Sequence, residues 1–77
     1  MKNEQALALL GAAIREKRLA RGVSQEAFAH SIGMHRTQFG HIEQGRKDCR
    51  LSTLLRIAVA LGVSISGLLS ALDEIED

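Results

Sequence analysis

The residues of this chain that are best suited to specific chemistry are polar and lie close together. They are Arg36, Thr37, Gln38 and His41, interleaved with the apolar Phe39 and Ile42. Arginine can bond guanine through two parallel hydrogen bonds, glutamine can do the same with adenine, and a threonine methyl can touch that of thymine. On a helix, Phe39 and Ile42 would mark the buried face and the polar side chains the outer one. The pattern indicates a helix that reads base edges in a DNA major groove.

Other kinds of chemistry find little support. Serine, histidine and carboxylates are present, but they form no nucleophile or dyad pattern, so no enzyme activity, catalytic residue or cofactor is expected. His35 and His41 are six positions apart and share no helical face, and with His30 they lack a completing cysteine or carboxylate, so no metal site is expected. Cys49 lies in a basic loop, where nearby cations could favour a reactive thiolate; an ordinary loop residue is the preferred interpretation.

The segment before the polar face has the features of a helix-turn-helix. Ser24 can cap a helix, and Phe28, Ala29 and Ile32 give it an apolar stripe. Gly33 follows where a left-handed turn is cheap only for glycine. Two short helices joined through such a turn are the signature of this motif. Gly40 lowers helix propensity, which indicates either close approach to a neighbour such as DNA or a poor helix former on a solvated face.

The remaining pattern predicts an all-α chain. A single domain over residues 1–77 is expected, with helices at roughly 5–20, 25–32, 36–44, 53–61 and 65–75. Ser52 and Ser64 are the expected N-caps of the last two helices. The expected core positions of the first and fourth helices are Leu7, Leu10, Ile14, Leu19, Leu54, Ile57, Ala58 and Leu61.

Composition is consistent with one small domain in a reducing cytoplasm. The chain has 77 residues, one cysteine, no apparent signal or membrane segment and a net charge of +1. Residues 1–50 carry nine Lys and Arg against five Asp and Glu, whereas residues 51–77 carry one against four. The basic first part is therefore the expected DNA-binding face. The acidic end either belongs to this separation of charge along the chain or is simply a solvated, frayed terminus.

The last two helices hold more apolar residues than the core of a monomer requires. A homodimer would bury them and would present two recognition helices to successive major grooves, about 34 Å apart. The alternative is that they complete the core. The expected interface residues are Leu55, Val59, Leu68, Leu72 and Ile75.

Four blocks of the chain resemble the Cro/phage-repressor helix-turn-helix family. They are residues 22–29 (GVSQEAFA), 32–37 (IGMHRT), 42–46 (IEQGR) and 54–64 (LLRIAVALGVS). The resemblance implies a compact five-helix, lambda-repressor-like domain that binds operator DNA as a dimer and regulates transcription. Residues 35–43 (HRTQFGHIE) also resemble the recognition helix of restriction–modification controller proteins.

The resemblance also implies roles for individual residues. Gln25, His35, Arg46 and Lys47 would contact phosphates, and Arg36, Thr37, Gln38 and His41 would read bases. Arg18 and Glu43 match a structural ion pair between the first and third helices, and a DNA contact of Arg18 is the alternative. Phe39 departs from the usual β-branched aliphatic residue, and the departure at Gly40 leaves the base register open.

Two alternatives accompany the expectation of a homodimeric regulator on a palindromic operator. One is an antitoxin that binds its operator and also a toxin through the fifth helix or the acidic end. The other is a purely protein-binding module on the same fold. RNA polymerase is a further partner that such a regulator could contact.

Overall fold

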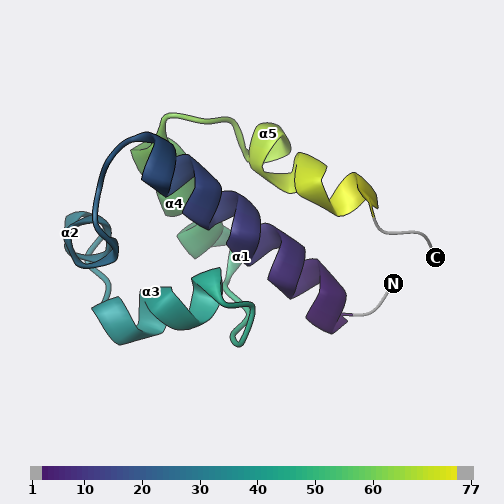
Figure 1. The fold of residues 1–77 in the computed structure, drawn as a ribbon, viewed down its shortest axis with the longest axis horizontal. Helices are drawn as coiled ribbons and strands as arrows, with labels where there is room; N and C mark the ends of the chain where they lie inside the picture. Colours follow the sequence, from purple (N-terminus) through teal and green to yellow (C-terminus); the bar gives the residue numbers. More distant parts are fainter. Residues whose placement is uncertain (1–2, 75–77) are drawn as a thin grey trace.

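A computed structural model describes residues 3–74, and these residues form a helical bundle without strands (Figure 1). The elements are α1 (Asn3–Ala20), α2 (Gln25–Ser31), α3 (Arg36–Glu43), α4 (Leu51–Leu61), α5 (Ile65–Leu69) and a 3₁₀ helix, η1 (Ser70–Glu74). The long α1 crosses the middle of the molecule and packs against α3, α4, α5 and η1, while α2 packs against α3 (Figure 1). The all-α prediction is confirmed for the described residues.

One continuous core lies between the helices. Phe28 and Phe39 form its aromatic part, with ring centroids 5.0 Å apart. Phe39 has no exposed surface, so the aromatic ring occupies the core position expected for a smaller aliphatic residue. The buried hydrophobic residues are Leu10, Ile14, Phe28, Ala29, Ile32, Phe39, Ile42, Leu54, Ile57, Ala58, Leu61 and Leu68.

The turn between α2 and α3 has the predicted glycine geometry. Gly33 has a φ of +70°, and the amide of Met34 donates to the carbonyl of Ala29 across 2.9 Å. This bond, with the amide of Gly33 on the carbonyl of His30, closes the end of α2 in a Schellman-type turn. At the other end of α2, the hydroxyl of Ser24 accepts from the amide of Ala27 at 3.0 Å, as the sequence predicts.

The last two predicted helices differ from the observed ones. The prediction of Ser52 as an N-cap is wrong: Arg50 has the extended capping conformation, α4 starts at Leu51, and Ser52 lies within its first turn. The continuous helix over 65–75 is also wrong, because α5 ends at Leu69 and η1 continues to Glu74. Gly67 and Ser70 favour helices weakly, and the Ser70 hydroxyl bonds the carbonyl of Gly67, so the chain tightens into 3₁₀ geometry there. The cap at Ser64 is confirmed, since its hydroxyl accepts from the amide of Gly67.

Two expected positions of apolar side chains are corrected. Leu19 is 55% exposed, because Arg18, four residues after Ile14, takes the inward position at that turn of α1. Leu68 has no exposed surface within a single chain, so its side chain is part of the core and is not available to an interface. Within residues 3–74, no single helix is long and apolar enough to cross a membrane, and only α4 taken together with residues 65–73, across a 105° bend, has the length and composition.

Candidate nucleic-acid interface

The outer face of α3 carries the side chains with base-reading chemistry. Arg36, Thr37 and Gln38 are exposed and His41 is half-buried, while Phe39 and Ile42 face the core. The first turn of α3 therefore presents a guanidinium, a hydroxyl and an amide to solvent from a helix that is anchored on its opposite side. This arrangement is suited to insertion of α3 into a groove.

A polar hollow of about 310 Å³ joins this face to the start of α2. It brings together residues from three segments, and it includes candidates for both base and phosphate contacts. The residues that line it are Gln25, Arg36, Thr37, Gly40, His41, Gln44 and Arg46. We refer to it as the α3 hollow.

Two of the candidate phosphate residues lie elsewhere. Lys47 lines a separate hollow of about 320 Å³, together with Gln38 and Cys49. His35 is the exposed N-cap residue of α3, and its side chain makes no capping hydrogen bond. The candidate contacts thus surround α3 and do not share one site.

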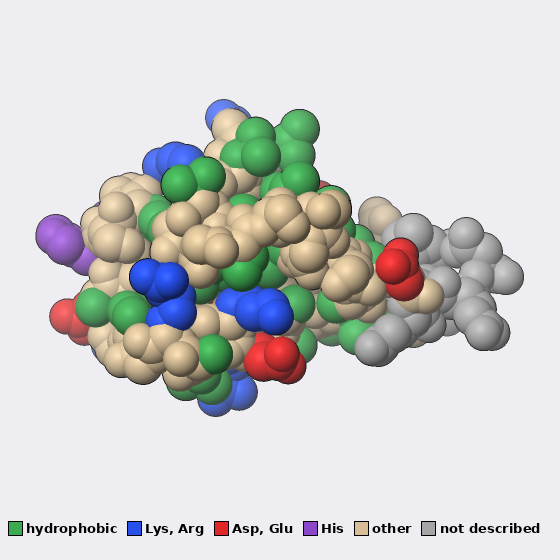
Figure 2. All heavy atoms as spheres, turned by 90° about the horizontal axis from the view of Figure 1, so that it is seen from above, with side chains coloured by type: hydrophobic (Ala, Val, Ile, Leu, Met, Phe, Trp, Pro, Cys, Tyr) green, Lys and Arg blue, Asp and Glu red, His purple; other side chains and the backbone are tan. Residues whose placement is uncertain are grey.

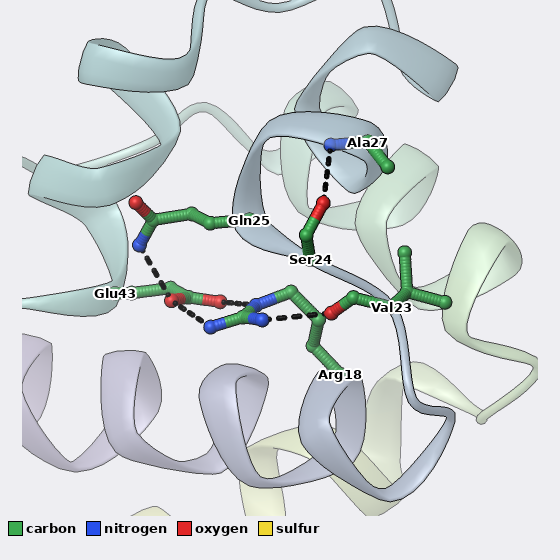
Figure 3. Close-up of polar contacts among 6 residues, drawn as sticks. All are labelled: Arg18, Val23, Ser24, Gln25, Ala27 and Glu43. Carbon is green, nitrogen blue, oxygen red and sulfur yellow. Dashed lines mark hydrogen bonds and ion pairs between the residues drawn. The ribbon is translucent and has the colours of Figure 1, made fainter.

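Arg18 and Glu43 form a buried ion pair behind the α3 hollow (Figure 3). Nε of Arg18 donates to Oε2 of Glu43 at 2.7 Å, and Nη2 donates to Oε1 at 3.1 Å. The third guanidinium nitrogen, Nη1, donates to the carbonyl of Val23 at 2.8 Å. The side chains are 7% and 1% exposed, so this paired geometry ties α1 to α3 and to the loop before α2 with little contact with solvent.

Gln25 lies over α3 and joins the same cluster (Figure 3). Its Nε2 donates to Oε1 of Glu43 at 2.9 Å. A Cβ on Gly40 would stand 3.3 Å from Oε1 of Gln25, so the glycine leaves room for this side chain. The close approach that Gly40 indicates in the sequence is therefore to Gln25. The sequence did not reveal the Gln25–Glu43 bond, and Gly40 was the only signal for it.

Glu26 is a second neighbour of the interface that the sequence did not reveal. Its Oε2 lies 3.7 Å from Nη1 of Arg36, and both side chains are more than half exposed. A pair this open to water contributes little to folding. It does place a carboxylate beside Arg36, the arginine at the start of α3, where it can influence the direction of the guanidinium.

Cys49 has the opposite character from a reactive thiolate. Partial burial, and then the charge of Asp48, raise the pKa of the Cys49 thiol above its usual value. The amide of Cys49 donates to Oδ1 of Asp48 at 2.8 Å, which keeps the carboxylate close. The thiol is therefore protonated at neutral pH, and the redox-sensing alternative loses its physical basis.

Exposed apolar side chains gather on α4. Val59 is 78% exposed and Leu55 is 45% exposed, and both line a shallow apolar hollow of about 460 Å³ with Ile32 and Ala60. Hydrophobic side chains also gather along the upper edge of the view in Figure 2. Leu72 is half-buried and packs against the core. Ile75 lies outside the described residues. Of the expected interface set, Leu55 and Val59 offer the exposed surface.

The sequence matches the model of the helix-turn-helix domain family over residues 9–71. It is 37% identical to the control protein C.SmaI of Serratia marcescens over 62 residues, which cover 80% of this chain and 74% of that protein. The crystal structure of the restriction–modification controller C.AhdI from Aeromonas hydrophila superposes with a TM-score of 0.83 at 32% identity, over 88% of this chain and 99% of the other. The clp gene regulator ClgR from C. glutamicum gives a TM-score of 0.84 at 28% identity, over 88% and 87%.

Proposed function

The chain belongs to the helix-turn-helix domain family, and on this premise we propose that it is a sequence-specific DNA-binding transcription regulator. It acts as a homodimer on a palindromic operator, in the cytoplasm, where that DNA is found. The observation that carries the proposal is the outer face of α3, where Arg36, Thr37 and Gln38 are exposed on a helix whose other face is buried in the core.

The proposed contacts divide into two groups by what they touch. Arg36, Thr37, Gln38 and His41 read base edges, and Gln25, His35, Arg46 and Lys47 hold phosphates. The second group fixes the position of the protein on the duplex, and the first group chooses the sequence. The α3 hollow supports the action of both groups on one stretch of DNA, because Arg46 and Gln25 line it together with Arg36 and His41.

The similarity to C.SmaI and C.AhdI supports a more specific role. The named relatives are a control protein and a restriction–modification controller. The match to this chain covers 74% of the first protein and 99% of the second. We therefore propose that its operator controls a restriction–modification operon. Occupancy of that operator depends on protein concentration, because dimerisation is coupled to DNA binding.

The decisive experiment is selection of binding sites from a random DNA pool, followed by footprinting of the selected sequence. We expect an inverted repeat whose half-sites are centred about one helical turn, roughly 34 Å, apart or a multiple of it. Recovery of no preferred sequence would contradict sequence-specific binding. An unrepeated site would contradict the symmetric dimer.

A pair of variants tests the two groups of contacts on the selected operator. Arg36→Ala should cost about 1–3 kcal/mol of binding free energy and relax the choice of base at one position of each half-site. Lys47→Ala should weaken operator and unrelated DNA alike. Competition titrations give both quantities, and unchanged selectivity of the Arg36 variant would refute its assignment to a base.

A further inference from the structure

We propose that Arg15 of α1 binds a backbone phosphate of the DNA, in a second hollow beside the α3 hollow. This inference rests on the proposed function, since it adds a contact to the same DNA. It assigns a specific contact to a residue in α1, a helix for which the sequence predicts core positions and the pair partner Arg18 but no DNA contact of Arg15. The ligand is a phosphodiester group, and the contact carries no sequence information.

The second hollow measures about 590 Å³ and lies where α1, α2 and α3 meet. It is lined by Arg15, Arg18, Gln25, Glu43 and Gln44. Gln25 and Gln44 also line the α3 hollow, so the two hollows adjoin along these side chains. Arg15 therefore faces the same side of the molecule as the proposed DNA contacts.

Among the residues whose side chains the structure describes, 3–73, no carboxylate around this hollow is left to compensate Arg15. Glu43 is the only carboxylate of these residues that lines it, and both of its oxygens accept hydrogen bonds from Arg18. One of them also accepts from Gln25. Arg15 is exposed and makes no ion pair with another residue among 3–73, the residues whose side chains the structure describes. Within that part, the hollow therefore holds a positive charge beside a neutralised pair.

The donors present fit an oxyanion in particular. A guanidinium matches two phosphate oxygens with parallel N–H groups, and it is always protonated. The side-chain amide of Gln44 lies at the same hollow and can add a neutral donor. Because a DNA strand presents its phosphates in a row, two adjoining hollows, with Arg46 at one and Arg15 at the other, can take phosphates of a single strand.

The salt dependence of DNA binding tests the proposal on the whole chain. Each lost phosphate contact should reduce the slope of log K against log salt concentration by about 0.9. Because a homodimer carries Arg15 twice, the slope should fall by about 1.8 for the dimer. Arg15→Gln should show this reduction on the selected operator and on unrelated DNA, with the ratio of the two affinities unchanged. Lys17→Gln is the matched control, because it removes the same charge from the same helix at a position that lines neither hollow. Its slope should equal that of the unchanged protein.

The outcomes distinguish the phosphate contact from the proposed function. A slope for Arg15→Gln equal to that of the unchanged protein overturns the contact and leaves the proposed function standing. An equal reduction in both variants also overturns it, since net charge alone would then explain the effect. If the unchanged protein binds no DNA, the proposed function fails, and the contact fails with it. Circular dichroism spectra and melting curves of both variants establish that the comparison is between folded proteins.

Discussion

Arg18 shows how much a single buried charge organises this small molecule. Its guanidinium contacts Glu43 of α3 and the carbonyl of Val23, and Gln25 reaches the same carboxylate from α2. A buried charge is tolerated only when its partners satisfy it, and in the described structure no buried side-chain nitrogen or oxygen lacks a hydrogen bond. The orientation of α3 therefore depends on the polar cluster of Arg18, Gln25 and Glu43 as well as on apolar packing.

Removal of the carboxylate should expose this dependence. Glu43→Gln leaves the charge of Arg18 buried without its counter-ion, and we expect a loss of about 3–5 kcal/mol in the free energy of unfolding. Glu26→Gln breaks the exposed pair with Arg36 and should cost less than about 1 kcal/mol. Urea unfolding followed by circular dichroism measures both. Equal losses in the two variants would contradict a special role for the buried pair.

At the scale of elements, two glycines permit the close approach of α1 to the end of α3. A Cβ on Gly11 would collide with the backbone carbonyls of Ile42 and Glu43. Gly45 has a φ of +73°, and its Cβ would lie 2.7 Å from Cα of Ala8 in the backbone of α1. Backbone atoms cannot move aside as a flexible side chain can. The close approach of α1 to the end of α3 thus requires that neither Gly11 nor Gly45 carries a Cβ.

A comparison of Gly22 with Gly45 separates the stability cost of contact with α1 from the cost of a positive φ. Gly22 has nearly the same positive φ as Gly45, but a Cβ there would meet nothing within 4 Å. Gly22→Ala should therefore cost about 1–2 kcal/mol, from the left-handed conformation alone. Gly45→Ala should cost about 1–3 kcal/mol more, because α1 must also shift. Thermal melts of the two variants test this difference, and matching melting temperatures would show that α1 accommodates the methyl group without cost.

At the scale of the whole molecule, the exposed apolar side chains of α4 bear on assembly. Val59 and Leu55 lie beside Arg56, whose Nη1 donates to the carbonyl of Ile32 at the end of α2. A chain of 77 residues buries only roughly 60% of its unfolded surface, so covering this patch would add stability that a monomer lacks. The proposed dimer would cover it and would join two copies of the recognition helix rigidly.

Val59→Glu is the direct test of that interface. The side chain is 78% exposed in the single chain, so the substitution should leave the fold intact while placing two charges against one another in the dimer. Sedimentation should show a monomer at concentrations where the unchanged protein dimerises, with weaker operator binding. Leu19→Glu, at another exposed apolar residue, should still dimerise. A Val59 variant that sediments as a dimer would move the interface away from α4.

The helix caps, the turn and the apolar stripes of this protein can be predicted from its sequence, because they depend on residues that are close together in the chain. The caps at Ser24 and Ser64 and the turn at Gly33 depend on residues within a few positions, and the stripes of Phe28, Phe39 and Ile42 follow the helical period. The family resemblance added the ion pair of Arg18 and Glu43, which the structure contains. The polar face of α3 follows from the same short-range rules, although its contacts with bases stay a prediction.

Only the tertiary structure decided which side chains meet across separate helices. The packing of α1 against α3 brings Arg15 to the same hollow as Gln44. The packing of α5 buries Leu68, which periodicity alone left free for a partner. Gly40 indicated a place of close approach in the sequence, but the neighbour is Gln25, fifteen positions away. Such choices depend on distances between elements, and a periodic pattern describes each element only by itself.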